Sequence, residues 1–195
     1  MSSPRQPDHP IAPLFLNRWS PRAFDGSDMP EEDVATLFEA ARWAPSAFNA
    51  QPWRFLYAQR GERDWERFLD LLVPFNREWA QSASLVIIFC SDSMIETKWG
   101  GAEVSHSHSF DTGAAWACLA LQASLMGYQA HGMSGVDFDR ARVELQVPER
   151  FRIEAAAVVG RIGNPATLSE KLRARETPSG RKPIGDCAFR GYFPA

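Results

Sequence analysis

The stretch from Asp111 to Met126 constrains the fold of this chain most, because its residues are small or apolar almost all round a helix. Gly127 follows the stretch and suits a C-terminal cap. A helix without a polar face must be covered on every side. In a chain of 195 residues, this cover comes either from a second subunit packed closely over the small residues or from a central position within one chain.

Another helix is predicted upstream, with Ser27 or Asp28 as its N-cap and Pro30 at an early helical position. Acidic residues fill its first turn. Apolar residues recur along one face at helical spacing: Val34, Leu37, Phe38 and Ala41. Pro45 is expected to end this helix, because the residue before a proline avoids the helical conformation.

The loop at residues 44–53 is polar and bracketed by prolines. Ser46 offers a hydroxyl, and Asn49 and Gln51 each offer a donor and an acceptor, so the loop can present neutral hydrogen-bonding groups to a flat heterocycle. It can equally be an ordinary connection whose polar side chains satisfy local turns. The residues alone leave both interpretations open.

Three runs predict strands. Residues 53–58 are aromatic and aliphatic, and the preceding Pro52 favours an edge position or a strand start. Residues 84–90 form a continuous β-branched run that is typical of a buried central strand, and residues 154–160 form another candidate.

Shorter helices and one irregular segment complete the chain. The predicted helices run from Pro13 to near Trp19 with Leu14, Phe15 and Leu16 inward, from Arg63 to Phe75, and from Asp137 to about Gln146. Residues 91–109 lack periodicity, and we expect a mobile excursion over a site or a subunit seam.

Charge and hydropathy limit the partners and the location. The formal net charge is -3 without a stripe of Lys and Arg, which argues against a nucleic-acid partner. No apolar run approaches the roughly 18 residues of a membrane span, and the N-terminus lacks the apolar core of a signal peptide. We therefore expect a cytoplasmic protein with one domain over residues 1–195, a mobile lead-in at 1–10, and a basic arm at 174–195 that is either disordered or clamped onto a partner.

Two short segments suit contacts to a ligand. Arg18, Ser20 and Arg22 can close on a phosphate or a carboxylate, although a solvated basic turn has the same composition. Gly132 and Gly135 suit a tight backbone that lets a ligand approach peptide N–H groups.

The histidines and cysteines give little indication of a metal site. His106 and His108 have no third ligand at a persuasive spacing, so a polar contact to a substrate or a solvated loop position remains. Cys90, Cys118 and Cys187 are widely spaced and odd in number, which argues against disulfides and a zinc site.

Three motifs together resemble the FMN-dependent nitroreductase family over about residues 13–183. Arg-Trp-Ser-Pro-Arg-Ala-Phe at 18–24 is similar to its opening motif, and residues 44–53 to its Pro-Ser-x-x-Asn-x-Gln-Pro-Trp signature. Residues 110–133 with Ser134-Gly135 resemble its central dimer helix and flavin-facing turn. The resemblance implies an α+β fold: a mixed, largely antiparallel sheet flanked by helices, in an intertwined homodimer whose C-terminal arm crosses to the partner.

The resemblance also implies roles around the FMN. Arg18 and Ser20 would hold the phosphate and the ribityl chain, with Arg181 or Lys182 adding charge there. Arg22 would lie near flavin N1 and the C2 carbonyl, where a cation makes hydride acceptance at N5 easier. One flavin face would be lined by Pro45, Ser46 and Ala47. Asn49 would reach the cofactor from the other subunit, and Gln51 belongs to the same signature. Asn76 would bind the pyrimidine edge, and the backbone N–H groups of Ser134 and Gly135 would point toward O4 and N5.

Two positions depart from the family pattern. Trp19, within the first motif, replaces a usually basic residue, and Trp79 stands where some members place a lysine near the flavin. Fewer cations around the ring would lower the reduction potential or alter how tightly FMN is kept.

The implied function is hydride transfer from NADH or NADPH, through flavin N5, to a small electron-poor acceptor such as a nitroaromatic or a quinone. The two substrates would bind alternately, and no side chain need act as a nucleophile, because the cofactor carries the chemistry. A flavin-binding protein of this fold without turnover is one alternative. A specialised flavin oxidase or dehalogenase of one metabolite is another.

Overall fold

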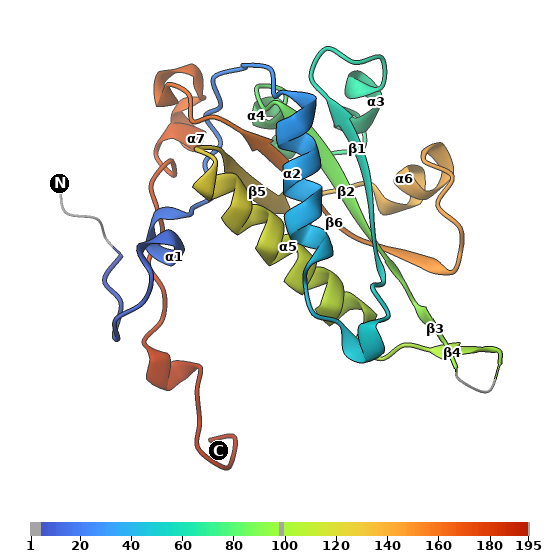
Figure 1. The fold of residues 1–195 in the computed structure, drawn as a ribbon. Helices are drawn as coiled ribbons and strands as arrows, with labels where there is room; N and C mark the ends of the chain where they lie inside the picture. The colour runs from blue at the N-terminus through green and yellow to red at the C-terminus, as the bar shows by residue number, and fades with distance from the viewer. Residues whose placement is uncertain (1–4, 98–99, 195) are drawn as a thin grey trace.

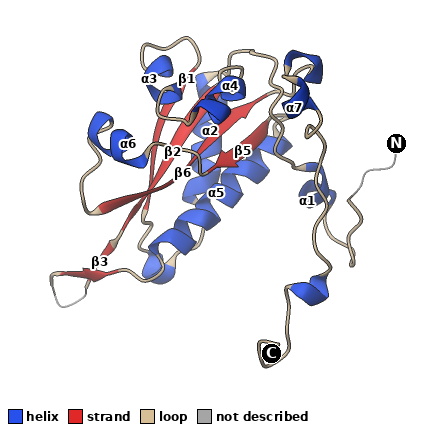
Figure 2. Ribbon diagram, turned by 180° about the vertical axis from the view of Figure 1, so that it is seen from behind, coloured by secondary structure: helices blue, strands red, loops and turns tan. Residues whose placement is uncertain are grey.

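The computed structural model describes residues 5–97 and 100–194. Its main sheet has four antiparallel strands in the order β1-β2-β6-β5: Trp53–Gln59, Leu85–Asp92, Phe151–Gly160 and Gln129–Met133. Helices α2 (Glu31–Arg42) and α5 (His108–Leu125) cross one face of this sheet (Figure 1). Helices α3 (Trp65–Leu69), α4 (Pro74–Ala80) and α6 (Phe138–Glu144) lie on the other face (Figure 2). The predicted α+β fold is confirmed.

The sheet separates two hydrophobic cores, because alternate residues of β2 point to opposite faces. Odd-numbered residues from Leu85 to Phe89 pack with α2 and α5, and even-numbered residues from Val86 to Cys90 pack with α3, α4 and α6. The strand is buried along its whole length. This confirms the central buried strand predicted at 84–90.

The other strands agree with the sequence in part. Strand β1 begins directly after Pro52 and lies at an edge of the sheet, as predicted. Strand β6 begins three residues before the predicted start at Glu154. Strand β5 was not predicted as a strand, because Gln129–Met133 contains a glycine and no β-branched residue.

Helix α2 starts later than predicted. Pro30, with φ -57° and ψ 143°, is the N-cap, and its carbonyl accepts from the backbone nitrogens of Asp33 and Val34. Ser27 is not the cap, because its hydroxyl donates to Asp25 and its carbonyl accepts from Ser84. The predicted N-cap at Ser27 or Asp28 is therefore wrong, whereas the end before Pro45 is confirmed.

The single helix predicted from Arg63 to Phe75 is also wrong. It divides into α3 and α4 because Pro74 has no backbone N–H and clashes with a preceding helical turn. The predicted inward side chains Trp65, Phe68, Leu69 and Leu72 are nevertheless buried.

Helix α1 (Pro13–Asn17) forms where the sequence predicts it but ends before Trp19. It has no buried residue, and Phe15 is 54% exposed, so the inward orientation predicted for Phe15 is wrong within one chain. Helix α6 agrees better, since Asp137 caps it by accepting from the Arg140 nitrogen at 3.1 Å. It ends at Glu144, two residues before the predicted Gln146.

Helix α5 begins at His108, three residues before the predicted start, and Gly127 follows its end with φ 80°, as a cap requires. The inner residues Ala115, Leu119 and Ala123 are fully or almost fully buried. An outer stripe at helical spacing is exposed: Phe110, Gly113, Ala117 and Leu125. A helix covered all round by its own chain, one of the two interpretations above, is therefore wrong.

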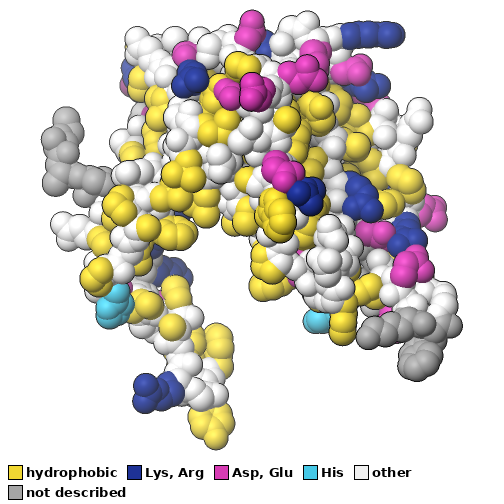
Figure 3. Space-filling view, viewed as in Figure 1, with side chains coloured by type: hydrophobic (Ala, Val, Ile, Leu, Met, Phe, Trp, Pro, Cys, Tyr) yellow, Lys and Arg dark blue, Asp and Glu magenta, His cyan; other side chains and the backbone are white. Residues whose placement is uncertain are grey.

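Residues 91–109 and the C-terminal segment extend from the body. The former contain a hairpin of β3 (Met94–Glu96) and β4 (Ala102–Val104), so they have regular structure that the sequence did not predict. After η2 (Pro165–Thr167) and α7 (Glu170–Arg173), the chain runs out as an arm with one short turn, η3 (Ile184–Asp186). Apolar side chains, in yellow, follow the arm in Figure 3, and Tyr192 and Phe193 are 89% and 87% exposed.

Parts of three predictions lie outside the described residues: 1–4 of the lead-in, 98–99 of the segment at 91–109, and 195 of the arm. Of the helices in the described ranges, none combines the length and the apolar character needed to cross a membrane.

Candidate functional site

A cavity of about 620 Å³ lies along the outer side of α5, beside β5 and β6. Apolar side chains line its middle, among them Phe89, Trp116 and Met133. Its polar lining residues are Arg18, Ser20, Ser109, Thr112, Ser134 and Glu154. Ser109 and Leu121 both line it, and the helical rise between them is about 18 Å. The cavity is therefore an elongated groove.

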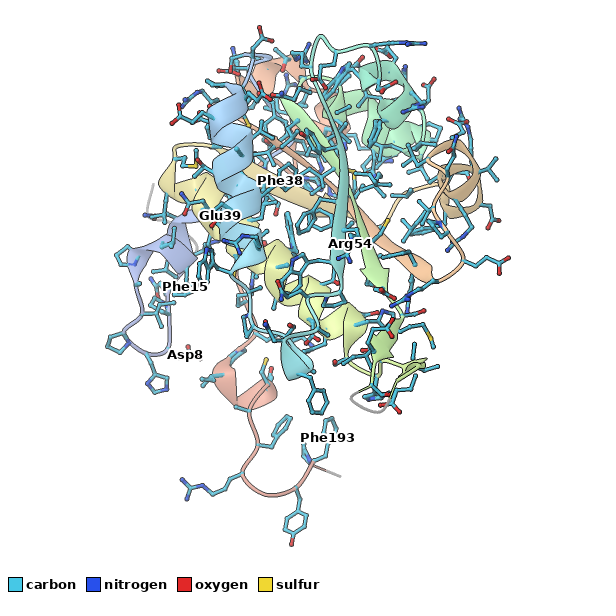
Figure 4. The ribbon with its side chains drawn as sticks, turned by 45° about the vertical axis from the view of Figure 1, so that its right-hand side comes forward. Asp8, Phe15, Phe38, Glu39, Arg54 and Phe193 are labelled. Carbon is cyan, nitrogen blue, oxygen red and sulfur yellow. The ribbon has the colours of Figure 1, made fainter. Side chains whose placement is uncertain are left out.

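One end of the cavity is formed by Arg18 and Ser20, which we call the basic end. Both follow α1, which carries Phe15 (Figure 4). Phe15 also lines the cavity. The backbone nitrogen of Trp19 donates to Gln129 Oε1 at 3.1 Å. This bond places the basic end where α5 finishes and β5 begins.

Two further arginines surround Arg18. Arg5 Nη1 donates to the carbonyls of Leu16 and Arg18, and Arg5 Nε donates to the carbonyl of Ser179 in the arm. Burial lowers the pKa of Arg18, and the charges of Arg5 and Arg181 lower it further. Arginine remains charged after such a shift. The basic end therefore gathers three like charges, which suits a phosphate or another anion.

Arg22 lies further along the same segment, near the aromatic ring of Trp79. Its Nε is buried and has no hydrogen-bond partner among the residues that the structure describes. Its guanidinium carbon is 5.8 Å from the Trp79 ring centroid. Burial lowers the pKa of Arg22, Arg175 lowers it further, and Glu176 opposes the shift. A buried donor without an acceptor is costly, so this position suits the electron-rich edge of a ligand.

His131 supports this arginine-bearing segment from β5. Its Nδ1 is 2.7 Å from the carbonyl oxygen of Pro21, which can only accept, so Nδ1 carries the hydrogen. The ring lies 4.5 Å from that of Trp79. Burial and the nearby charges of Arg22 and Arg18 lower the pKa of His131 to about 4, against the opposing effect of the Pro21 carbonyl. His131 is therefore neutral at pH 7.

Asn76 and Gly135, both predicted to contact the flavin, also contact each other. Asn76 is almost fully buried in α4, and its Nδ2 donates to the Gly135 carbonyl at 3.2 Å. A Cβ atom at Gly135 would lie 2.4 Å from that nitrogen and 2.7 Å from Cγ2 of Val73. The glycine is needed here because a side chain occupies the space. Ser134, one residue earlier, lines the cavity.

The loop at residues 44–53 lies elsewhere in the chain. The predicted site residues Pro45, Ser46, Ala47, Asn49 and Gln51 do not line the cavity, and the nitrogen of Ala47 donates to Asp111 at the start of α5. Positive φ angles of 52°, 56° and 50° occur at Phe48, Asn49 and Gln51. Such angles are strained for residues with side chains and often mark functional loops. Phe48 is 91% exposed, so the loop displays an aromatic ring to its surroundings.

The other end of the cavity is formed by Ser109, Thr112 and Glu154, which we call the acidic end. Glu154 Oε1 accepts from the Ser109 hydroxyl at 2.7 Å and from the Ser91 hydroxyl at 2.5 Å. His108 Nδ1 lies 2.7 Å from Ser91 Oγ. The acidic end thus combines a carboxylate, three hydroxyls and an imidazole.

The two histidines of the His-x-His pair differ in their surroundings. His108 begins α5 and is mostly buried beside Glu154, whereas His106 is exposed. Within residues 5–97 and 100–194, no group of three or more His, Cys, Asp or Glu is arranged to hold a metal ion. The structure brings Arg18, Ser20 and Ser134 to one cavity, with Arg22, Asn76 and Gly135 in the adjoining segments. Arg181 lies near Arg18, and Lys182 follows it in the exposed arm.

Sequence reasoning missed several residues that shape this region: Arg5, Trp116, His131, Glu154 and Glu176. Only Glu154 gave a signal, since it is the one charged residue within the strand predicted at residues 154–160. The others act through contacts distant in sequence. Arg5 and Ser179, for example, are separated by 174 positions.

Comparisons with known proteins bear on this geometry. The sequence model for the Nitroreductase family matches residues 16–87, which contain the basic end, Arg22, the loop at 44–53 and Asn76. A solved structure described as an oxidoreductase containing FMN is 47% identical to this chain. It superimposes with a TM-score of 0.96 over 100% of this chain and 98% of its own.

Two relatives extend the comparison. An uncharacterized 15.4 kDa protein of Mycolicibacterium smegmatis is 30% identical over 148 residues, which are 72% of this chain and 97% of that protein. The Major NAD(P)H-flavin oxidoreductase of Aliivibrio fischeri is 32% identical over 87 residues, which are 43% of this chain and 39% of that protein. The chain thus spans less than half the length of this second relative. With the matched family model and the similarity along its whole length to a solved relative, this chain belongs to the nitroreductase family.

Proposed function

We propose that this protein is an FMN-dependent oxidoreductase that takes hydride from NADH or NADPH and passes it to a small electron-poor acceptor. The named function of the Aliivibrio fischeri relative and the FMN of the 47% identical structure support this proposal. The observation that carries it is the gathering of Arg5, Arg18 and Arg181 at one end of an otherwise mainly apolar cavity. This arrangement suits a flat ring that ends in a phosphate.

The residues present fit FMN. Arg18 and Ser20 would bind the phosphate and the ribityl chain, and Arg181 or Lys182 would add positive charge. The buried Nε of Arg22, without a partner in the described part of the chain, suits the electron-rich N1 and C2 carbonyl region. Asn76, Ser134 and Gly135 would orient the pyrimidine side through hydrogen bonds.

The bound flavin would supply hydride acceptance and release at N5. Arg22 would keep positive charge beside the ring system, where electrons arrive with the hydride. His131 would hold the Pro21 carbonyl, and so the backbone between Ser20 and Arg22, without adding a charge of its own. The apolar middle of the cavity would exclude water from the ring. The chain then acts by orientation and charge, with no side chain as a nucleophile.

We further propose that two copies of the chain share two such sites. The exposed outer stripe of α5, the arm with Tyr192 and Phe193, and Phe48 on its strained loop are apolar surfaces that a second copy would cover. Because Pro45, Ser46, Ala47 and Asn49 lie outside the cavity of their own chain, they would reach the flavin of the partner. In this arrangement donor and acceptor would bind alternately at the same ring, giving ping-pong kinetics.

A direct experiment tests the proposal. The purified protein is expected to be yellow, to be bleached by NADH or NADPH without oxygen, and to regain its colour with a nitroaromatic or a quinone. A colourless protein that cannot be reconstituted with FMN would remove the proposal. Flavin that binds but is reduced by neither nicotinamide would favour a binding role without turnover. The nitroaromatic or quinone class of acceptor and a cytoplasmic location stay predictions.

A further inference from the structure

None of the residues proposed to bind FMN belongs to the acidic end of the cavity. Glu154 Oε1 is occupied, because the Ser91 and Ser109 hydroxyls both donate to it. A serine hydroxyl has one hydrogen, so His108 Nδ1 must donate to Ser91 Oγ. These bonds hold the carboxylate from one side.

The second carboxylate oxygen, Oε2, has only a weak partner. Glu154 Oε2 lies 3.5 Å from Nε of Arg152, whose side chain is 65% exposed. Ion pairs with such an exposed partner contribute little. Glu154 lines the cavity and therefore keeps an acceptor oxygen that can take a hydrogen from a ligand.

Thr112 supplies a second, independent observation. It lines the cavity and is 2% exposed, and its Oγ1 has no hydrogen-bond partner among residues 5–97 and 100–194. A buried hydroxyl without a partner is costly. A ligand group that accepts the Thr112 hydrogen would therefore be favoured at this end.

The acidic end adjoins the middle of the cavity. Met133 pairs with Ala156, and Glu154 precedes Ala156 by two residues of β6. Glu154 lies at the register shift between β2 and β6, and its side chain meets Ser109 of α5. A substrate ring stacked on the flavin near Met133 would therefore lie in the same cavity as Glu154 and Thr112, and a substituent on that ring can point toward both.

We infer that the acidic end recognises a primary carboxamide on a ring bound in the cavity. The amide N–H donates to Glu154 Oε2, and the amide oxygen accepts from the Thr112 hydroxyl. A carboxylate has no donor and is repelled by Glu154, and a methyl ketone satisfies Thr112 alone. The inference rests on the proposed function. The amide can come from the nicotinamide ring of the hydride donor or from the acceptor.

Two matched pairs distinguish these sources, because each exchanges an amide NH₂ for a methyl group. For the donor, flavin reduction is compared between NADH and the reduced 3-acetylpyridine analogue of NAD. For the acceptor, flavin reoxidation is compared between 4-nitrobenzamide and 4-nitroacetophenone. The members of a pair differ in intrinsic reactivity, so the measured quantity is the amide-to-ketone ratio of kcat/KM in a variant relative to the unmodified protein.

Two substitutions have different expected effects. Glu154→Gln replaces the charged acceptor and is expected to lower the amide-to-ketone ratio about fivefold to tenfold in the half-reaction whose substrate uses the site. Thr112→Val removes the donor to the carbonyl, so amide and ketone weaken alike, by about threefold to tenfold, and the ratio stays constant. Glu149→Gln and Thr167→Val, at exposed positions, are the matched controls and are expected to change neither quantity.

Calorimetry with redox-inert benzamide and acetophenone gives a readout besides turnover, with and without FMN. Benzamide is expected to bind the unmodified protein more tightly, and Glu154→Gln to remove this preference. Unchanged ratios in both half-reactions of an FMN-loaded, reducible protein would overturn the inference and leave the proposed function standing. A Glu154→Gln protein with altered mass or melting and an unchanged benzamide preference would also overturn it, because Glu154 would then be structural. If the protein binds no FMN, the proposed function fails, and the calorimetry still decides the inference.

Discussion

The Oε1 atom of Glu176 lies 2.7 Å from the backbone nitrogen of Arg22 and 2.8 Å from that of Ala23. This carboxylate ties the root of the arm to the segment that carries Arg18 and Arg22. Glu176→Ala leaves two N–H groups without their acceptor, and we expect it to lower the free energy of unfolding by about 2 kcal/mol. Urea unfolding measures this loss. Glu103→Ala, in the exposed hairpin, is the control, and equal stability of the two variants would contradict the assignment.

Replacing Arg18 and replacing Arg22 by alanine are expected to affect different quantities, FMN retention and the rate of flavin reduction. In the proposed site, Arg18→Ala would remove a charge-assisted contact to phosphate, so FMN binding is expected to weaken by about 1.5 to 3 kcal/mol. Arg22→Ala would remove the proposed cation beside the ring, so NADH is expected to reduce the flavin more slowly while FMN is largely retained. Ultrafiltration measures retention, and stopped-flow absorbance measures reduction. Arg63→Ala, at an exposed position, is the control. Equal effects of both substitutions on both quantities would disprove this division of roles.

His131 makes stability depend on pH. Its folded-state pKa of about 4 lies below the ordinary value of 6.5, so the unfolded chain binds the proton more readily between these values. The free energy of unfolding therefore falls as the pH drops from 6.5 to 4, by about 3 kcal/mol from this group. His131→Gln should lack this component of the dependence, whereas His9→Gln, at an exposed position, should keep it. Unfolding curves at pH 7.5 and 4.5 test both, and parallel losses in all three proteins would refute the prediction.

Gly135→Ala tests the close approach of Asn76. The added methyl group meets Asn76 Nδ2 at 2.4 Å and Val73 Cγ2 at 2.7 Å, so one of them must move. We expect a loss of about 1 to 3 kcal/mol in stability and weaker FMN binding as Asn76 shifts. Gly185→Ala is the control, since nothing lies within 4 Å of its added Cβ. Thermal melting and flavin titration measure the two effects, and an unchanged Gly135→Ala protein would show that the contact is easily relieved.

Leu125→Glu tests the outer stripe of α5. Leu125 is 65% exposed and does not line the cavity. A carboxylate there is expected to keep two copies apart and to release FMN, because the proposed site needs residues from both. Light scattering after gel filtration measures the mass, and visible absorbance measures the flavin. Ala35→Glu on the exposed side of α2 should stay dimeric and yellow. A monomeric Leu125→Glu protein that keeps its FMN would end the proposal of shared sites.

Local sequence patterns predicted those helices and strands that are determined by residues within or next to them. The apolar run of β2, the prolines around α2 and the glycine after α5 each act within a few residues. Strand β5 was missed because its pairing with β6, and not its own composition, makes it a strand. The hairpin of β3 and β4 likewise depends on partners that periodicity does not show.

The candidate site divides in the same way. Arg18, Ser20, Arg22 and Ser134 follow from short motifs, and the chain brings them to the cavity or its adjoining segments. The bonds from Arg5 to Ser179 and from Arg22 to Glu176 could not be predicted, because each joins segments more than 150 positions apart. The burial of Thr112 is also a property of the folded chain, since nothing in its neighbours marks its hydroxyl as unpaired.

The left-handed residues Phe48, Asn49 and Gln51 have a consequence for engineering. Glycine at these positions would relieve strain of about 1 kcal/mol or more each, so a library selected for heat tolerance is expected to accumulate such replacements. The same replacements delete an aromatic ring and two carboxamides from the loop. Thermostability and pigment content should therefore move in opposite directions among the selected clones.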